Sequence, residues 1–390
     1  MFLCCGSTAV RQRTLPGKER GSGFGKSILS IPVKDRIFMD FSKIFMKNAT
    51  PTKVGGQAIL EGLMMRGSRA LAIAVRQPDG DVHLTVEPLP APGRWKKMPI
   101  LRGVVSFVSS LVTGTRILMY SADVLENCAD AEGNTYYEDD KLTLWMNEKF
   151  GKEKANTIMM YVSVVLAMLL TVGVFIILPT WIMSLLKRAG VESPFVLNLI
   201  EGILRICMFV VYVSLVSKMP DIRRTFMYHG AEHKTIHCYE NGLELTPANA
   251  QQFYTLHPRC GTSFLMFVMV ISLLVFSLLG WPNLAARIIS RLLLIPVIAG
   301  LSYELLQFTG RHDGTCVRAL SMPGIMLQKL TTKEPTDDMV EVAIIAVKAV
   351  LPSHEDPSIP VEYWVGRVKP TGEYVKDEEE TAKYKAEREK

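Results

Sequence analysis

Two long stretches without a single charged residue constrain this chain more than any other feature. The first covers residues 155–186 and the second covers residues 260–286. About 20 consecutive apolar residues are enough to cross a bilayer as a helix. A helix in the core of a soluble protein is rarely so long and so apolar. The sequence therefore predicts a membrane protein in which both stretches are transmembrane helices.

Two further apolar segments, 193–217 and 284–310, contain charges. Ionisable residues in membrane helices usually face the helix bundle or a water-filled cavity, whereas those near a helix end can extend to the interface. We expect the second arrangement for Arg287 and Arg291. An intramembrane polar cluster and a position near the helix ends are both open for Glu201, Arg205 and Glu304.

A fifth apolar segment, 103–115, has 13 residues and is too short to cross unaided. We expect it to lie on the bilayer or to dip into it. The predicted fold is thus a mainly α-helical, polytopic membrane bundle of about four transmembrane helices plus a short re-entrant or interfacial helix. A small cytoplasmic segment precedes it. In that segment, strands near 71–77 and 82–89 flank the turn at Pro78-Asp79-Gly80-Asp81 and predict a β-hairpin.

The remaining boundaries follow from composition. Glycines at Gly55 and Gly56 indicate close packing of the backbone against another segment. The predicted parts are a basic, poorly ordered leader (1–50), the small α+β segment (51–102), an interfacial helix with an acidic connector (103–157), a four-helix membrane domain (158–310) with a histidine-rich loop (218–262), a cytoplasmic helical segment (311–351) and a charged, flexible tail (352–390).

Charge sets the expected topology and excludes several classes of protein. Lysines and arginines gather in the segment before the first span and in the loop between the second and third, which the positive-inside rule places in the cytoplasm. Four spans then put both termini there. Seven cysteines in 390 residues are too few for a disulfide-stapled scaffold. The net charge of +6 belongs largely to the leader and the membrane-flanking loops, so nucleic-acid binding is not expected.

Histidines concentrate at one place. Four of the seven, His229, His233, His237 and His257, fall in the loop between the second and third spans. A helix over 226–239, ended by Asn241-Gly242, places the first three on one face. A second short helix from Thr246-Pro247 delivers His257 and Cys260 to the start of the third span. Imidazole and thiolate ligands of this kind suit a divalent ion, above all zinc.

The motif His229-Gly-Ala-Glu232-His233 has the H-x-x-E-H spacing of inverted zinc proteases. Two histidines four residues apart bind one ion, with His257 or Cys260 completing the site. Glu232 would act as general base on a water whose pKa the ion lowers. An anionic substrate group could contact three arginines: Arg223, Arg224 and Arg259. The alternative is a cluster of interfacial histidines that cap helices or pair with acidic groups.

Five ordered blocks, GGQAILEGLMMRG, MYHGAEHKTIHCYENGLELT, TLHPRCGTSFL, IPVIAGLSYELL and PGIMLQKLTTKEPTDDMVEVAI, resemble the YqhQ-like family of bacterial membrane proteins. The resemblance covers about 52–350. The family is catalogued as uncharacterised and described as predicted metal-dependent. It implies a location in the bacterial inner membrane and a metal ion, and it supplies no substrate.

Three functions fit these observations. The first is a metal-dependent membrane enzyme, a hydrolase acting on an anionic lipid or a peptide at the cytoplasmic face. The second is a non-catalytic scaffold or regulator in which a structural metal or the histidines brace the loop. The third is a transporter of small solutes or ions that uses Glu201, Arg205 and Glu304, although four spans without a repeat favour it little unless the chain forms a homo-oligomer.

Overall fold

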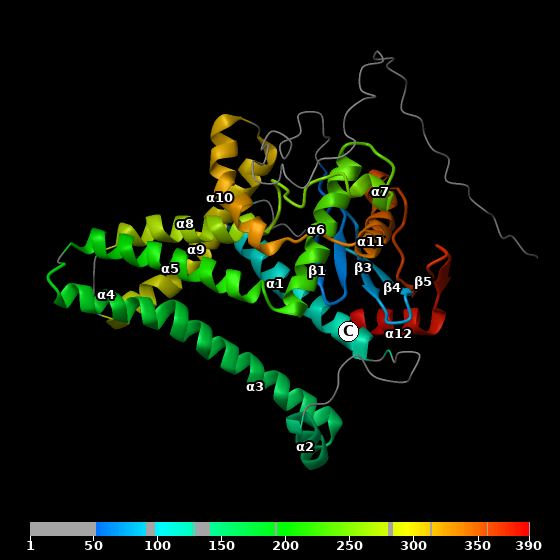
Figure 1. The fold of residues 1–390 in the computed structure, drawn as a ribbon, viewed down its shortest axis with the longest axis horizontal. Helices are drawn as coiled ribbons and strands as arrows, with labels where there is room; N and C mark the ends of the chain where they lie inside the picture. The colour runs from blue at the N-terminus through cyan, green and yellow to red at the C-terminus, as the bar shows by residue number, and fades with distance from the viewer. Residues whose placement is uncertain are drawn as a thin grey trace, which may run out of the picture. The chain divides into compact units, whose positions relative to one another are not determined.

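The computed structural model describes residues 52–90, 98–126, 128, 141–191, 193–279, 284–312, 314–356 and 358–389, which all belong to one compact unit of the chain. The predicted leader and residues 129–140 of the predicted acidic connector lie outside these residues. Within the unit, Figure 1 shows a set of apolar helices and a β-sheet accompanied by further helices.

The sheet is antiparallel and contains six strands in the order β1-β2-β3-β4-β5-β6. The predicted hairpin is confirmed, because β3 and β4 pair from Ala70↔Pro88 to Arg76↔Val82. The glycine-rich stretch before it forms two more strands, β1 and β2, which place β1 at an edge of the sheet. The strand bounds are β1 Gly55–Ile59, β2 Gly62–Arg66, β3 Ala70–Arg76, β4 Val82–Pro88, β5 Trp364–Val368 and β6 Tyr374–Lys376.

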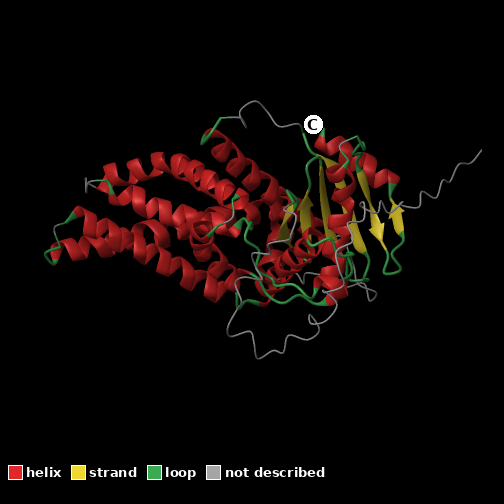
Figure 2. Ribbon diagram, turned by 90° about the horizontal axis from the view of Figure 1, so that it is seen from above, coloured by secondary structure: helices red, strands yellow, loops and turns green. Residues whose placement is uncertain are grey.

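Both faces of the sheet are covered by helices (Figure 2). Alternate strand residues face opposite sides. Leu63 and Met65 belong to a core shared with α6 (Pro220–Glu240) and α11 (Asp337–Glu355). Met64, Leu71, Ile73 and Val75 instead pack against Ile117, Val124 and Leu125 in the second half of α1 (Leu101–Glu126).

The apolar helices confirm a mainly helical membrane protein with four candidate spans. The helix α3 (Lys152–Val172) continues through a π-helical turn, η4 (Gly173–Ile177), into α4 (Leu178–Arg188). The others are α5 (Pro194–Val216), α8 (Thr262–Ser277), α9 (Leu284–Arg311) and α10 (Thr315–Thr331), while α2 (Lys141–Phe150) precedes α3 and α7 (Pro247–Ala250) precedes α8. The helices long and apolar enough to cross are α1, residues 161–188, α5 and residues 289–311.

Two of these helices differ in length from the sequence prediction. The predicted short helix at 103–115 is part of the 26-residue α1. The predicted span at 260–286 contains α8, which has 16 residues and covers about 24 Å. The second half of α1 packs on the sheet. The whole helix is nevertheless long and apolar enough to be a candidate span, so the predicted short re-entrant or interfacial helix stays a prediction.

Packing on the sheet also limits how the chain can cross. The end of α1 and the whole of α6 lie against the sheet, so the chain between them leaves and returns on one side. That segment contains α3–α4 and α5, which are both long and apolar enough to cross. The helices α8 and α9 pack together between α7 and α10. The helix α9 contains a candidate span, whereas α8 is a shorter apolar helix, so the number of crossings stays a prediction.

The predicted flexible tail over 352–390 is wrong. Within it, β5 pairs with β4 and β6 pairs with β5. The helix α12 (Glu378–Arg388) covers β5, and its buried Tyr384 donates a hydrogen bond of 2.9 Å to the buried carboxylate of Glu87. The alternation of Glu and Lys resembles a solvated tail because most of this helix faces water. Only Thr381 and Tyr384 are buried in it.

A buried histidine on β4 predicts acid sensitivity of the fold. Burial and the nearby Arg367 lower the pKa of His83 to about 4, although Asp377 partly opposes them. In the unfolded chain its pKa is about 6.5. Below pH 6.5 the unfolded chain therefore takes up a proton that the folded chain refuses, and stability falls until about pH 4.

We expect the chelator-treated protein to lose about 2 kcal/mol through His83 between pH 7.5 and pH 5. His83→Gln should flatten this part of the pH dependence of thermal unfolding. Equal pH dependence in the variant and the original protein would contradict the assignment. The hydroxyl of Tyr120 lies 3.0 Å from His83 Nε2. His83→Gln leaves Tyr120 in place, so the packing around residue 83 stays the same.

Candidate metal centre

The helix α6 carries most of the site. It begins at Pro220, as a proline in the first turn favours, and ends at Glu240 before Asn241 and Gly242, whose φ is +68°. The predicted helix end is thus confirmed. The predicted short helix is also confirmed as α7, where Thr246 Oγ1 accepts a hydrogen bond from Asn249 N.

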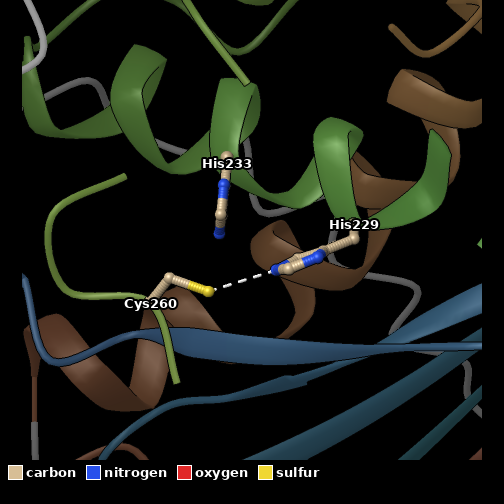
Figure 3. A group of neighbouring side chains, drawn as sticks. All are labelled: His229, His233 and Cys260. Atoms are coloured by element: carbon tan, nitrogen blue, oxygen red, sulfur yellow. Dashed lines mark hydrogen bonds between the residues drawn. The ribbon is translucent and has the colours of Figure 1, made fainter. Parts of the chain in front are cut away.

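Three side chains converge between α6 and the start of α8: His229, His233 and Cys260 (Figure 3). One nitrogen or sulfur atom of each lies within 4.8 Å of those of the other two. His229 Nε2 is 3.2 Å from Cys260 Sγ. His233 Nε2 is buried and has no hydrogen-bond partner among the described residues. An unpartnered imidazole nitrogen beside a buried sulfur has the chemistry of a cation-binding site.

Backbone carbonyls orient both imidazoles. His229 Nδ1 donates to Thr331 O at 2.8 Å, and His233 Nδ1 donates to Thr255 O at 2.5 Å. A carbonyl only accepts, so Nδ1 carries a proton in both rings and Nε2 is the atom available to an ion. Metal-binding histidines almost always hold their second nitrogen in this way. Thr255 and Thr331 come from segments far apart in the sequence, and no sequence pattern pointed to them.

The electrostatics of the three side chains agree with a cation site. Burial alone would lower the pKa of His229, but Cys260 outweighs it and raises the pKa to about 9. Burial would raise the pKa of Cys260, but His233 and His229 hold it well below its usual range. The imidazole and thiolate thus share a proton, which a divalent cation bound by both would replace.

Glu232 lies on the same helix and faces the edge strand β1. Its Oε1 accepts a hydrogen bond from Gly56 N at 2.7 Å, and its Oε2 is buried without a partner among the described residues. Burial raises the pKa of this carboxyl, while His229 and His233 oppose that shift. The structure therefore offers one oriented, unpartnered carboxylate oxygen near the two imidazoles.

His257 is not part of the group formed by His229, His233 and Cys260. It belongs to a second group with His237 and Glu240, whose ligand atoms also lie within 4.8 Å of one another. His257 Nε2 is 3.4 Å from Glu240 Oε2, and His237 Nε2 donates to Leu256 O at 2.9 Å. Glu240 also accepts from Thr52 N at 2.8 Å. These hydrogen bonds account for the second group, which braces the loop against α6.

The three arginines expected to bind substrate have different surroundings. Arg259 Nη2 pairs with Glu240 at 2.5 Å, and Arg224 pairs with Glu61 in the turn between β1 and β2. Both cations are therefore largely neutralised. Arg223 is exposed on α6. Only Arg223 among them lies on the surface without a carboxylate partner among the described residues.

The charged residues of the apolar helices form two separate groups of ion pairs rather than one cluster. Glu201 binds Arg205 at 2.6 Å and Arg291 at 2.5 Å. The expectation of Arg291 at a helix end is therefore wrong, because α9 turns it toward α5. Glu304 instead binds Arg102 Nε at 2.7 Å and ties α9 to the start of α1. The side chain of Arg287 lies outside the described residues.

The comparisons with known proteins identify the family of this chain. The profile of a family described as "Protein of unknown function (DUF1385)" matches residues 98–353. A relative in Bacillus subtilis (strain 168), "Uncharacterized protein YqhQ", is 36% identical over 321 residues, which cover 78% of this chain and 94% of the relative. The chain belongs to this family. The DUF1385 match begins just before α1 and ends in α11, so it contains the three convergent side chains. No solved structure matches.

Proposed function

We propose that this DUF1385 protein is a metal-dependent membrane enzyme, a hydrolase, whose ion is held by His229, His233 and Cys260. One observation carries the proposal. Two backbone carbonyls fix the imidazoles so that Nε2 of each faces the thiolate, as a second shell does around a metal. The donor set of two nitrogens and one sulfur suits zinc, and three protein ligands are typical of a catalytic zinc site.

Each residue of the site then has a defined task. A bound zinc ion would supply Lewis-acid chemistry and lower the pKa of water toward about 7. Glu232 would take a proton through Oε2, while Gly56 N holds Oε1 in place. Inverted zinc proteases use a downstream glutamate as third ligand. Here Glu240 is bound by Arg259, and Cys260 takes that place.

The surroundings support a substrate that reaches the site at the membrane surface. Cys260 lies two residues before α8, and the strand β1 contacts the site through Gly56 N and Glu232. The positive-inside rule predicts that this surface and both termini face the cytoplasm. The proposed location is a bacterial inner membrane. Exposed Arg223 could contact the anionic group of a lipid or peptide substrate.

The second candidate is a scaffold or regulator with a structural metal. The hydrogen-bonded group of His237, Glu240 and His257 favours it, because a bracing function needs no more than such buried contacts. The two candidates differ at Glu232. A scaffold needs the ligands and the fold but has no use for a general base.

Glu232→Gln tests this difference, because the amide keeps the shape of the side chain and can still accept from Gly56 N. We expect about one metal ion per chain, by elemental analysis, in both the original protein and the variant. We also expect the variant to fail to restore the phenotype of a strain that lacks the gene. No stoichiometric metal in the original protein would contradict metal dependence, and full restoration by Glu232→Gln would contradict catalysis.

A further inference from the structure

The end of one helix, α10, supports both proposed histidine ligands. His229 Nδ1 donates to the carbonyl of Thr331, the last residue of α10. His233 Nδ1 donates to Thr255 O, and the hydroxyl of Thr332 donates to that of Thr255 at 3.3 Å. The groups that orient the two imidazoles therefore belong to the end of α10 or to a residue that this end contacts.

The third proposed ligand, Cys260, is tied to the same turn of α10 by the side chain of Gln328. This side chain is fully buried, and its amide binds the backbone of His257 twice. Gln328 Oε1 accepts from His257 N at 2.9 Å, and Gln328 Nε2 donates to His257 O at 2.9 Å. The same carbonyl of His257 accepts from Cys260 N at 3.3 Å. One backbone oxygen thus joins Gln328 to the turn that carries the thiolate.

The amide of Gln328 also contacts the chain beyond Cys260. Its Nε2 donates to Ser263 Oγ at 3.4 Å, and Ser263 N donates to Cys260 O at 3.1 Å. Gly324, one turn earlier on α10, permits this close approach, because a Cβ atom there would lie 2.5 Å from Ser263 Oγ and 2.9 Å from Ser263 Cα. Gln328 therefore bridges the residues before and after the proposed ligand.

Helix packing alone does not require an amide at this position. Apolar contacts already hold α10 against its neighbours, since Leu327 packs with Val213 of α5 and Met266 of α8. A buried amide costs free energy unless its polar atoms are paired. Those of Gln328 are paired with the segment around Cys260, so its polar character serves that segment.

We propose that Gln328 is a positioning residue of the metal centre, whose amide sets the place of the Cys260 thiolate relative to the two imidazoles. This role rests on the proposed metal function and assigns the ligand geometry to the end of α10. Loss of the amide would leave all three ligands in the chain but would free the turn that carries the thiolate. Loss of a group that orients a ligand weakens metal binding by about 10- to 100-fold.

Gln328→Met tests this role, because methionine has nearly the length of glutamine and forms neither hydrogen bond with His257. Cobalt(II) is the probe, since the d¹⁰ zinc ion has no absorption of its own. Competition with a chelator of known affinity gives the dissociation constant, and the charge-transfer absorption from thiolate to cobalt reports whether sulfur is bound. We expect Gln328→Met to bind cobalt about 10- to 100-fold more weakly, with less of this absorption per bound ion.

Two control variants separate positioning from stability. His257→Ala keeps the backbone N and O that Gln328 binds. Thr381→Val removes a buried hydroxyl of α12 that bonds to the backbone of Val365 in β5. Both should bind cobalt as the original protein does, although Thr381→Val should unfold at a lower temperature. Gln328→Asn, whose amide is one carbon too short to bind both backbone groups, decides the result if Gln328→Met does not fold.

The outcomes distinguish this role from the metal function itself. No stoichiometric cobalt in the original protein would contradict the metal function. Cobalt in the original protein, with equal affinity and an equal spectrum in the folded Gln328 variant, would overturn the positioning role alone. An equal loss of affinity in Thr381→Val would also overturn it, because the effect would then follow from stability.

Discussion

Replacing either His229 or His233 with alanine, or Cys260 with serine, is expected to reduce the bound metal from about one ion per chain to a trace. Loss of a residue that only orients a metal-binding histidine already weakens binding by about 10- to 100-fold, so loss of a ligand should cost more. Binding to the folded state alone also stabilises it. A chelator should therefore lower the unfolding temperature of the original protein and leave that of the variants unchanged.

Three further variants make this expectation specific. His312→Ala and Cys316→Ser alter an exposed histidine and an exposed cysteine outside the site, and both should keep the metal. His257→Ala should also keep it, because His257 contacts Glu240 rather than the first three side chains. The opposite result, loss of metal in His257→Ala and full binding in Cys260→Ser, would contradict the assignment of Cys260 as third ligand. It would favour His257, the alternative that the sequence left open.

The candidate metal ligands on α6 could be predicted from the sequence because their pairing depends on local spacing. Residues four apart on a helix share a face, so His229 and His233 could be paired without knowledge of the fold. The choice between His257 and Cys260 could not be made in this way. It depends on how the loop from α7 to α8 packs, and the bond from His257 N to Gln328 Oε1 on α10, 2.9 Å long, helps to fix that loop.

The same limit explains the two largest differences in the fold. A count of hydrophobic residues predicts the apolar helices, yet it cannot show that the second half of α1 packs over Leu71 and Ile73 on the sheet. Nor can composition reveal that the polar C-terminal segment pairs with β4, because only a few of its residues, such as Val365 and Tyr384, are buried. Both are tertiary contacts between distant segments.

Gly56 links the fold to the proposed chemistry, because it lies in β1 and its N–H donates to Glu232. A Cβ atom on Gly56 would lie 2.4 Å from Met64 O, 2.6 Å from Met65 Sδ and 3.1 Å from Glu232 Cδ. The backbone oxygen of β2 cannot yield without disturbing the strand pair. The neighbouring Gly55 has nothing within 4 Å of the same position, so the two residues form a matched pair.

Gly56→Ala should therefore destabilise the protein by about 1–3 kcal/mol, the usual cost of overpacking a core. Gly55→Ala should have the same unfolding temperature as the original protein. The added carbon also pushes against Glu232, so Gly56→Ala should fail to restore the phenotype, as Glu232→Gln does. It should still retain the metal. The proposed ligands lie on α6 and before α8, and β1 contributes none of them. Normal function in a folded Gly56→Ala protein would show that the contact between β1 and Glu232 has no part in the reaction.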